Sequence, residues 1–98
     1  MEPAGAETRS LRVVISGRVQ GVWFRAWTEQ QANRHRLDGW VRNCRDGTVE
    51  ALFSGRAVDV KAMLDDCSEG PPEANVTNVE SRPDQAPEAK GFKVLPTV

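Results

Sequence analysis

The sequence has few of the residues that build metal centres or redox sites. It contains two cysteines and one histidine in 98 residues. Cys44 and Cys67 stand in neither a CxxC pair nor a Cys/His cluster, so a zinc site has no ligand set here. We therefore expect no zinc site, and we expect no cofactor. We also expect two free, partly buried thiols, with a disulfide between them as the alternative.

Long hydrophobic runs are absent as well. No apolar segment approaches the roughly 20 residues of a membrane span, and residues 1–10 lack the apolar stretch of a secretory signal. The formal net charge is only −1, so no broad field attracts nucleic acid or an anionic membrane. These absences predict a cytoplasmic protein with neither a nucleic-acid nor a membrane partner. We also expect a monomer, although no pattern in the sequence settles the oligomeric state.

What remains is the composition and periodicity of one small α+β domain. Residues 1–9 are small, polar and charged, and we expect a flexible N-terminal tail there, followed by a domain over residues 10–98. Hydrophobic periodicity and turn signals predict seven elements. The expected strands are 11–15, 40–44, 48–54, 76–82 and 92–95, and the expected helices are 23–36 and 57–67.

This order predicts a ferredoxin-like βαββαβ sandwich, with an antiparallel sheet, two helices on one face and a short extra C-terminal strand. In such a sheet the first and second strands run parallel, with the third strand between them. Their carboxyl ends therefore lie at one rim, roughly 10 Å apart. Gly17 and Asn43 follow these two strand ends, so we expect them at the same rim.

The segment from Gly17 to Val22 leads directly into the first predicted helix. Gly17 and Gly21 permit a sharp turn that frees backbone N–H groups to point at one spot. A helix start adds further N–H donors and partial positive charge, and Arg25 can grip a tetrahedral oxyanion bidentately. These features predict a phosphate site, although the GK[ST] ending of a Walker loop is absent. Each feature alone is usually structural, so the hypothesis depends on their convergence at one rim.

Two segments resemble the signatures of the acylphosphatase family. They are GRVQGVWFR at residues 17–25, and GWVRN at 39–43 followed by DGTVE at 46–50. Their separation also matches the family, and the similarity extends from Leu11 to Leu95. The resemblance implies a ferredoxin-like, acylphosphatase-like domain over residues 10–98. It also implies metal-free hydrolysis of acyl phosphates to a carboxylate and inorganic phosphate, without a covalent intermediate.

The resemblance further implies roles for individual residues. By motif, Arg25 binds the phosphate and Asn43 orients the attacking water. The residues expected to offer backbone N–H groups to the phosphoryl oxygens are Arg18, Val19, Gln20, Gly21 and Val22. An acyl phosphate has a good leaving group, so positioning and charge stabilisation suffice. This fits two signatures that supply no histidine, cysteine or carboxylate base.

Other features invite a structural interpretation. The family commonly has a glycine after the first helix, but Arg34-His35-Arg36-Leu37 stands here, so the turn must strain or adopt another geometry. We expect His35 to be a partly buried helix residue and Asp65-Asp66 a solvated helix end. We expect packing roles for the three tryptophans, rather than stacking on RNA bases.

Two alternatives stay open. One is a non-catalytic ferredoxin-like module that binds an anionic ligand or an RNA, against which the presence of both Arg25 and Asn43 weighs. The other is an acylphosphatase-like domain within a larger carbamoyl-transfer enzyme. The length of the chain and its start at Met1 weigh against that second expectation.

Overall fold

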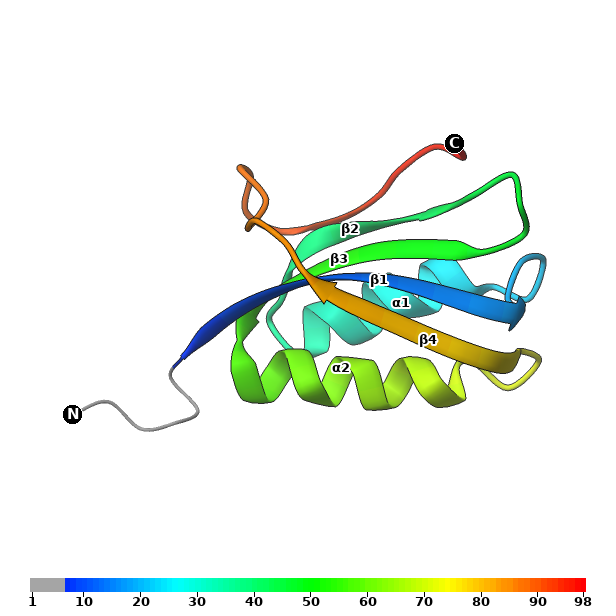
Figure 1. Ribbon diagram of the computed structural model, residues 1–98, viewed down its shortest axis with the longest axis horizontal. Coiled ribbons are helices and arrows are strands. Elements are labelled where there is room, and N and C mark those ends of the chain that lie inside the picture. Colours follow the sequence, from blue (N-terminus) through cyan, green and yellow to red (C-terminus); the bar gives the residue numbers. More distant parts are fainter. Residues whose placement is uncertain (1–6) are drawn as a thin grey trace.

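The computed structural model describes residues 7–98, which form one five-stranded sheet and two helices (Figure 1). Both helices cover the same face of the sheet. The elements follow the chain as β1 (Thr8–Arg18), α1 (Phe24–Arg34), β2 (Asp38–Asn43), β3 (Val49–Arg56), α2 (Ala57–Glu69), β4 (Asn75–Pro83) and β5 (Phe92–Val94). This confirms the predicted ferredoxin-like α+β fold.

The sheet order is β4-β1-β3-β2-β5, with β3 antiparallel to both β1 and β2. Ile15 of β1 and Asn43 of β2 both lie opposite Val49 of β3, so these strands end at one edge as predicted. The last strand differs from the expected antiparallel sheet, because β5 runs parallel to β2. A three-residue strand that follows a long connection can dock in either direction, and its sequence does not indicate which.

The core lies between the sheet and the helices. Leu11, Val13 and Ile15 alternate along β1 and are buried, which is the period-2 pattern of a strand covered on one face. Burial of each such side chain contributes about 1.5–3 kcal/mol to stability. The buried helix positions are Phe24, Thr28 and Ala32 on α1 and Val60, Met63 and Cys67 on α2. Cys67 and the half-buried Cys44 are both free thiols.

The N-terminal boundary differs from the predicted tail over residues 1–9. Thr8 and Arg9 belong to β1 and pair with Arg56 and Gly55 of β3. The carbonyl of Glu7 also accepts a hydrogen bond from the Ala57 N–H at 2.7 Å. Backbone pairing with the full length of β3 therefore extends the strand over polar residues that have nothing to bury. The rest of the predicted tail, residues 1–6, lies outside the described residues.

At the end of α1, where a glycine was expected, a residue with a side chain adopts a strained backbone conformation. Arg36 adopts the left-handed conformation, with φ of 60°. The Leu37 N–H donates to the Ala32 carbonyl at 2.9 Å and the Arg36 N–H to the Asn33 carbonyl at 3.1 Å, which is the Schellman pattern that glycine normally completes. His35 is half-buried, as expected, and its Nε2 lies 2.7 Å from Asp66 Oδ2. Asp66 thus joins the two helices.

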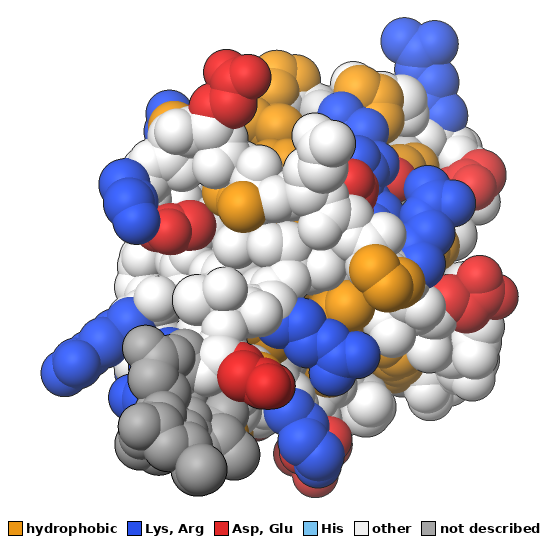
Figure 2. Space-filling view, turned by 60° about the vertical axis from the view of Figure 1, so that its left-hand side comes forward, with side chains coloured by type: hydrophobic (Ala, Val, Ile, Leu, Met, Phe, Trp, Pro, Cys, Tyr) orange, Lys and Arg blue, Asp and Glu red, His pale blue; other side chains and the backbone are white. Residues whose placement is uncertain are grey.

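The helix-free face of the sheet holds charges that are paired with each other. Glu50 of β3 accepts hydrogen bonds from Arg42 at 2.7 and 2.9 Å and from Arg12 at 3.0 Å. Both guanidinium groups also lie over the Trp40 ring, at 5.0 Å for Arg12 and 4.5 Å for Arg42. On the side shown in Figure 2, basic side chains likewise lie beside acidic ones. Within residues 7–98 no helix is long and apolar enough to cross a membrane.

Candidate active site

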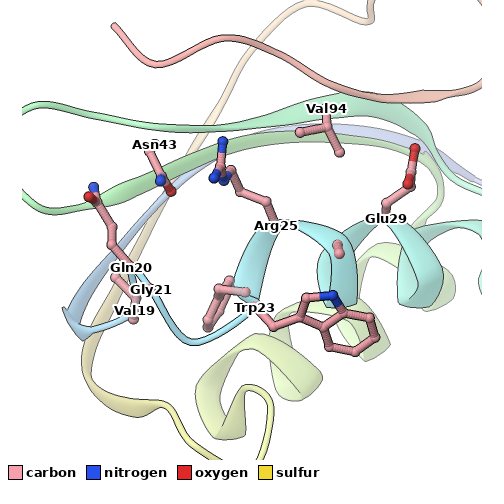
Figure 3. A pocket seen from close by; sticks show the side chains of 10 residues that line it. Val19, Gln20, Gly21, Trp23, Arg25, Glu29, Asn43 and Val94 are labelled. Atoms are coloured by element: carbon pink, nitrogen blue, oxygen red, sulfur yellow. The ribbon is translucent and has the colours of Figure 1, made fainter.

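The loop after β1 and the turn between β2 and β3 lie at the same end of the molecule (Figure 1). Between them is a cavity of about 340 Å³, which the first turns of α1 and the last strand complete (Figure 3). Two residues predicted as catalytic, Arg25 and Asn43, line this cavity together. The other lining residues are Val19, Gln20, Gly21, Trp23, Phe24, Ala26, Glu29 and Val94.

The backbone of the loop needs conformations that glycine favours. A β-bulge between Ser16 and Gly17 shifts the register with β4, and Gly17 has φ of 117°. A Cβ there would collide with the carbonyl oxygen of Asn75, so only glycine fits. Gly21 makes a second turn, with φ of 73°. The strand end is thereby bent into the loop that opens onto the cavity.

The side chain of Gln20 ties this loop to the end of β2. Its Nε2 donates to the carbonyl of Cys44 at 2.7 Å and to that of Thr48 at 2.9 Å. These carbonyls belong to the turn that directly follows Asn43. The two halves of the site are thus joined by one side chain. No local pattern in the sequence indicated this role, because the contacts join residues more than twenty positions apart.

The loop and the helix start hold hydrogen-bond donors that have no partner among residues 7–98. None of the backbone N–H groups of Val19 to Trp23 donates a hydrogen bond to another residue in the described part of the chain. The guanidinium of Arg25, in the first turn of α1, extends toward Asn43 (Figure 3). Within residues 7–98 it forms no ion pair. An unpaired cation next to free N–H groups at a helix N-terminus is suited to bind an anion.

Asn43 supplies an unpaired acceptor. Its Oδ1 is buried and, in the described part of the chain, is the buried side-chain polar atom that lacks a hydrogen-bond partner. Leaving such an atom unsatisfied costs about 1–3 kcal/mol. The backbone holds the residue firmly, because its carbonyl accepts a hydrogen bond from the Val98 N–H at 3.1 Å and the residue pairs with Val49. An amide oxygen that is held this way and left unpaired indicates a bound water or ligand group.

Two predicted binding residues, Arg18 and Val22, are not among those that line the cavity. Arg18 is the last residue of β1 and pairs with Asn75, and the side chain of Val22 is buried in the core. Their predicted contribution involves only backbone N–H groups and stays a prediction. Val19 does line the cavity, although its side chain is buried.

The tryptophans only partly follow the expected packing roles. Trp27 packs edge-on against Phe24, with ring centroids 5.3 Å apart. Trp40 lies in the sheet beneath two guanidinium groups. Trp23, in contrast, is 60% exposed and lines the cavity, so the prediction that it has a packing role was wrong. Its backbone is in the left-handed region, with φ of 68°. A bulky residue in this conformation is strained, and such strain is often found at functional sites.

Sequence reasoning also missed Glu29 and Val94. Glu29 belongs to neither of the two signatures, yet it lines the cavity one turn after Arg25. The i, i+4 spacing from Arg25 was the signal that could have found it. Val94 comes from the parallel strand β5, whose docking was not predicted. Residues 7–98 contain no group of three or more His, Cys, Asp or Glu side chains that could hold a metal ion.

Comparisons with known proteins agree on one family. The family model described as acylphosphatase matches residues 11–94. An acylphosphatase of Rhodospirillum rubrum is 50% identical over 90 residues, which cover 92% of this chain and 99% of that protein. The solved structure of an acylphosphatase from Coxiella burnetii superposes with a TM-score of 0.86 at 33% identity, covering 90% of this chain and 93% of that one. For the acylphosphatase from Bacillus subtilis the TM-score is 0.84 at 30% identity, with 91% and 99% covered.

Proposed function

The chain belongs to the acylphosphatase family, and we propose that it hydrolyses acyl phosphates in this cavity, with Arg25 and Asn43 at the centre of the chemistry. The observation that carries the proposal is that a guanidinium and a buried amide oxygen, both without a partner within residues 7–98, meet in one cavity. One group suits an anionic phosphoryl group and the other suits a water molecule. Hydrolysis of a phosphate anhydride needs both.

Phosphate binding is assigned to the loop after β1 and the start of α1. The phosphoryl oxygens accept hydrogen bonds from backbone N–H groups of residues 18–22 and from the guanidinium of Arg25. The partial positive charge at the N-terminus of α1 adds to this attraction. As bond breaking spreads negative charge over the equatorial oxygens, donors already in position stabilise it without reorganising.

Asn43 orients the nucleophile. Its Oδ1 accepts a hydrogen bond from a water molecule and holds that water in line with the bond between phosphorus and the acyl oxygen. The water oxygen bonds to phosphorus, the bond to the acyl oxygen breaks, and the acyl group leaves as a carboxylate. A phosphoryl oxygen takes the proton of the attacking water, which leaves inorganic phosphate as the second product.

The composition of the cavity supports a mechanism by positioning. Neither histidine nor cysteine lines it, and its single carboxylate, Glu29, lies one helical turn away from Arg25. A carboxylate leaves readily as an anion, so the departing group needs no general acid. The same chemistry requires no metal ion, and activity in the presence of a chelator is therefore part of the proposal.

The test is hydrolysis of benzoyl phosphate by the purified protein in excess chelator. We expect the wild type to be active, and Arg25→Gln and Asn43→Ala each to lose about 10²–10³-fold in kcat/KM. Matched controls come from the exposed side of α1, where Arg34→Gln and Asn33→Ala make the same changes outside the cavity. Circular dichroism of all variants checks that they remain folded.

Three results would contradict the proposal. An inactive wild type would show that the cavity does not catalyse hydrolysis and at most binds an anion. Loss of activity with chelator, restored by a divalent cation, would contradict the metal-free mechanism. Equal losses in the cavity variants and their controls would show that charge or folding, and not these two positions, determines the rate.

A further inference from the structure

The cavity extends beyond the groups that the phosphoryl group would use. Arg25 and Glu29 project from the same side of α1, one helical turn apart (Figure 3). Arg25 extends toward Asn43, whereas Glu29 extends toward Val94 of β5. With the phosphoryl group between the loop and Arg25, the acyl group of a substrate has the other end of the cavity available. We call this end, formed by Trp23, Ala26, Glu29 and Val94, the acyl end.

Two features of the acyl end are unusual for a protein surface. Trp23 is 60% exposed and Val94 is 40% exposed, which makes them two of the four exposed large hydrophobic residues in the described part of the chain. Both line this one cavity. Exposed apolar side chains that line one hollow mark a surface that binds an apolar group.

Glu29 brings a negative charge to these apolar walls. The residue is half-buried, and within residues 7–98 it forms no ion pair. Arg25, four positions earlier, directs its guanidinium toward Asn43 instead. The carboxylate of Glu29 is therefore available to act on whatever group enters the acyl end.

We propose that Glu29 determines acyl specificity, so that this enzyme prefers uncharged acyl groups over acyl groups that carry a carboxylate. The inference rests on the proposed hydrolysis of acyl phosphates. Charge repulsion between Glu29 and a second carboxylate in the same partly solvated cavity lowers kcat/KM about three- to tenfold. An uncharged acyl group meets only the apolar surfaces of Trp23 and Val94 and avoids this penalty.

The experiment compares three substrates of nearly equal shape. They are benzoyl phosphate, 4-carboxybenzoyl phosphate and the uncharged 4-carbamoylbenzoyl phosphate, each assayed with wild type and Glu29→Gln. The selectivity is the kcat/KM on the carbamoyl compound divided by that on the carboxy compound. We expect Glu29→Gln to reduce this ratio about three- to tenfold, and to leave the ratio between carbamoylbenzoyl and benzoyl phosphate unchanged. Added salt reduces the wild-type selectivity, because it screens the repulsion.

Glu88→Gln is the matched control, since Glu88 is exposed and lies beside a separate hollow with Asp38 and Ser54. Glutamine and glutamate have similar helix propensities, so α1 tolerates the change at position 29. An unchanged selectivity in Glu29→Gln, or an equal change in Glu88→Gln, overturns the inference while the proposed function stands. A wild type that hydrolyses none of the three compounds overturns the proposed function and the inference with it.

Discussion

Asn43 combines a firmly held backbone with an amide oxygen that lacks a hydrogen-bond partner in the described part of the chain. Such an atom destabilises the folded state, which supports the proposed role of Asn43 in holding the attacking water. The resemblance of the two signatures predicted Asn43 and Arg25 directly. It did not predict Glu29, because a carboxylate on a helix is usually a solvated side chain and only the structure shows which helix face lines the cavity.

For the same reason, we expect a substitution of Asn43 to lower the activity much more than the stability. Asn43→Ala removes an unsatisfied buried oxygen, so we expect the free energy of unfolding to fall by no more than about 0.5 kcal/mol. Urea denaturation, run beside the activity assay, measures this. A loss of several kcal/mol would show that Asn43 holds the fold together, and its effect on the rate would then not identify a catalytic residue.

Glu50 gives the protein an acid-sensitive contact. Burial opposes its ionisation, but the hydrogen bonds and positive charges of Arg42 and Arg12 outweigh burial and hold the pKa of this carboxyl below its usual value. A lowered pKa in the folded state contributes stability above the unfolded pKa of about 4.3 and loses it as the pH falls through the folded pKa.

We therefore expect Glu50→Gln to lower the free energy of unfolding by about 1–3 kcal/mol at pH 7, because two guanidinium groups lose their charged partner. The difference from wild type should shrink as the pH falls below about 4.3, where the carboxyl takes up a proton first in the unfolded chain and then, at lower pH, in the folded protein. Denaturation curves between pH 3 and 7 measure it, with the exposed Glu88→Gln as the comparison. A difference that stays constant over this range would contradict the assignment.

At the scale of elements, contacts between helices, strands and loops hold the site in place. Most elements could be predicted from periodicity, because the alternation in β1 and the apolar face of α2 are strong local signals. The ends of the elements depend on partners distant in sequence. Pairing with β3 extends β1 to Thr8, and docking on β2 determines the direction of β5. The local sequence predicts neither effect.

The end of α1 offers a stabilising change. Arg36 has φ of 60° within a Schellman turn, a conformation that costs a residue with a Cβ about 1–2 kcal/mol. Glycine avoids this strain but gains entropy in the unfolded chain, so Arg36→Gly should stabilise the protein by about 0.5–1 kcal/mol. Thermal denaturation measures the effect. Arg34→Gly, inside the same helix, should destabilise by about 1 kcal/mol, and equal signs in the two variants would contradict the interpretation.

Gln20 is the joint between the loop and the β2–β3 turn. Gln20→Met keeps the length of the side chain but removes the donor to Cys44 and Thr48. We expect a loss of about 1–2 kcal/mol in stability and about tenfold in kcat/KM, since loop and Asn43 no longer hold one geometry. The exposed Gln30→Met on α1 is the control. Full activity in Gln20→Met would mean that the glycines alone shape the loop.

At the scale of the whole molecule, the topology itself creates the site. Because β3 lies between β1 and β2, the loop after β1 and the end of β2 meet at one edge of the sheet, and α1 begins there as well. The proposed phosphate-binding loop and the proposed water-binding residue, Asn43, are thus brought together by the order of the strands. In the proposed mechanism the free donors are directed at phosphorus, and the carbonyl carbon of the substrate faces the apolar acyl end.

That arrangement makes one measurement decisive. Benzoyl phosphate is hydrolysed by the wild type in water enriched in ¹⁸O, and both products are analysed by mass spectrometry after correction for spontaneous hydrolysis. Attack on phosphorus, with the water held by Asn43 and the phosphoryl group by Arg25, places the label in inorganic phosphate and none in benzoate. Label in benzoate would show that water attacks the carbonyl carbon, and would contradict the central claim that this site positions water for phosphoryl transfer.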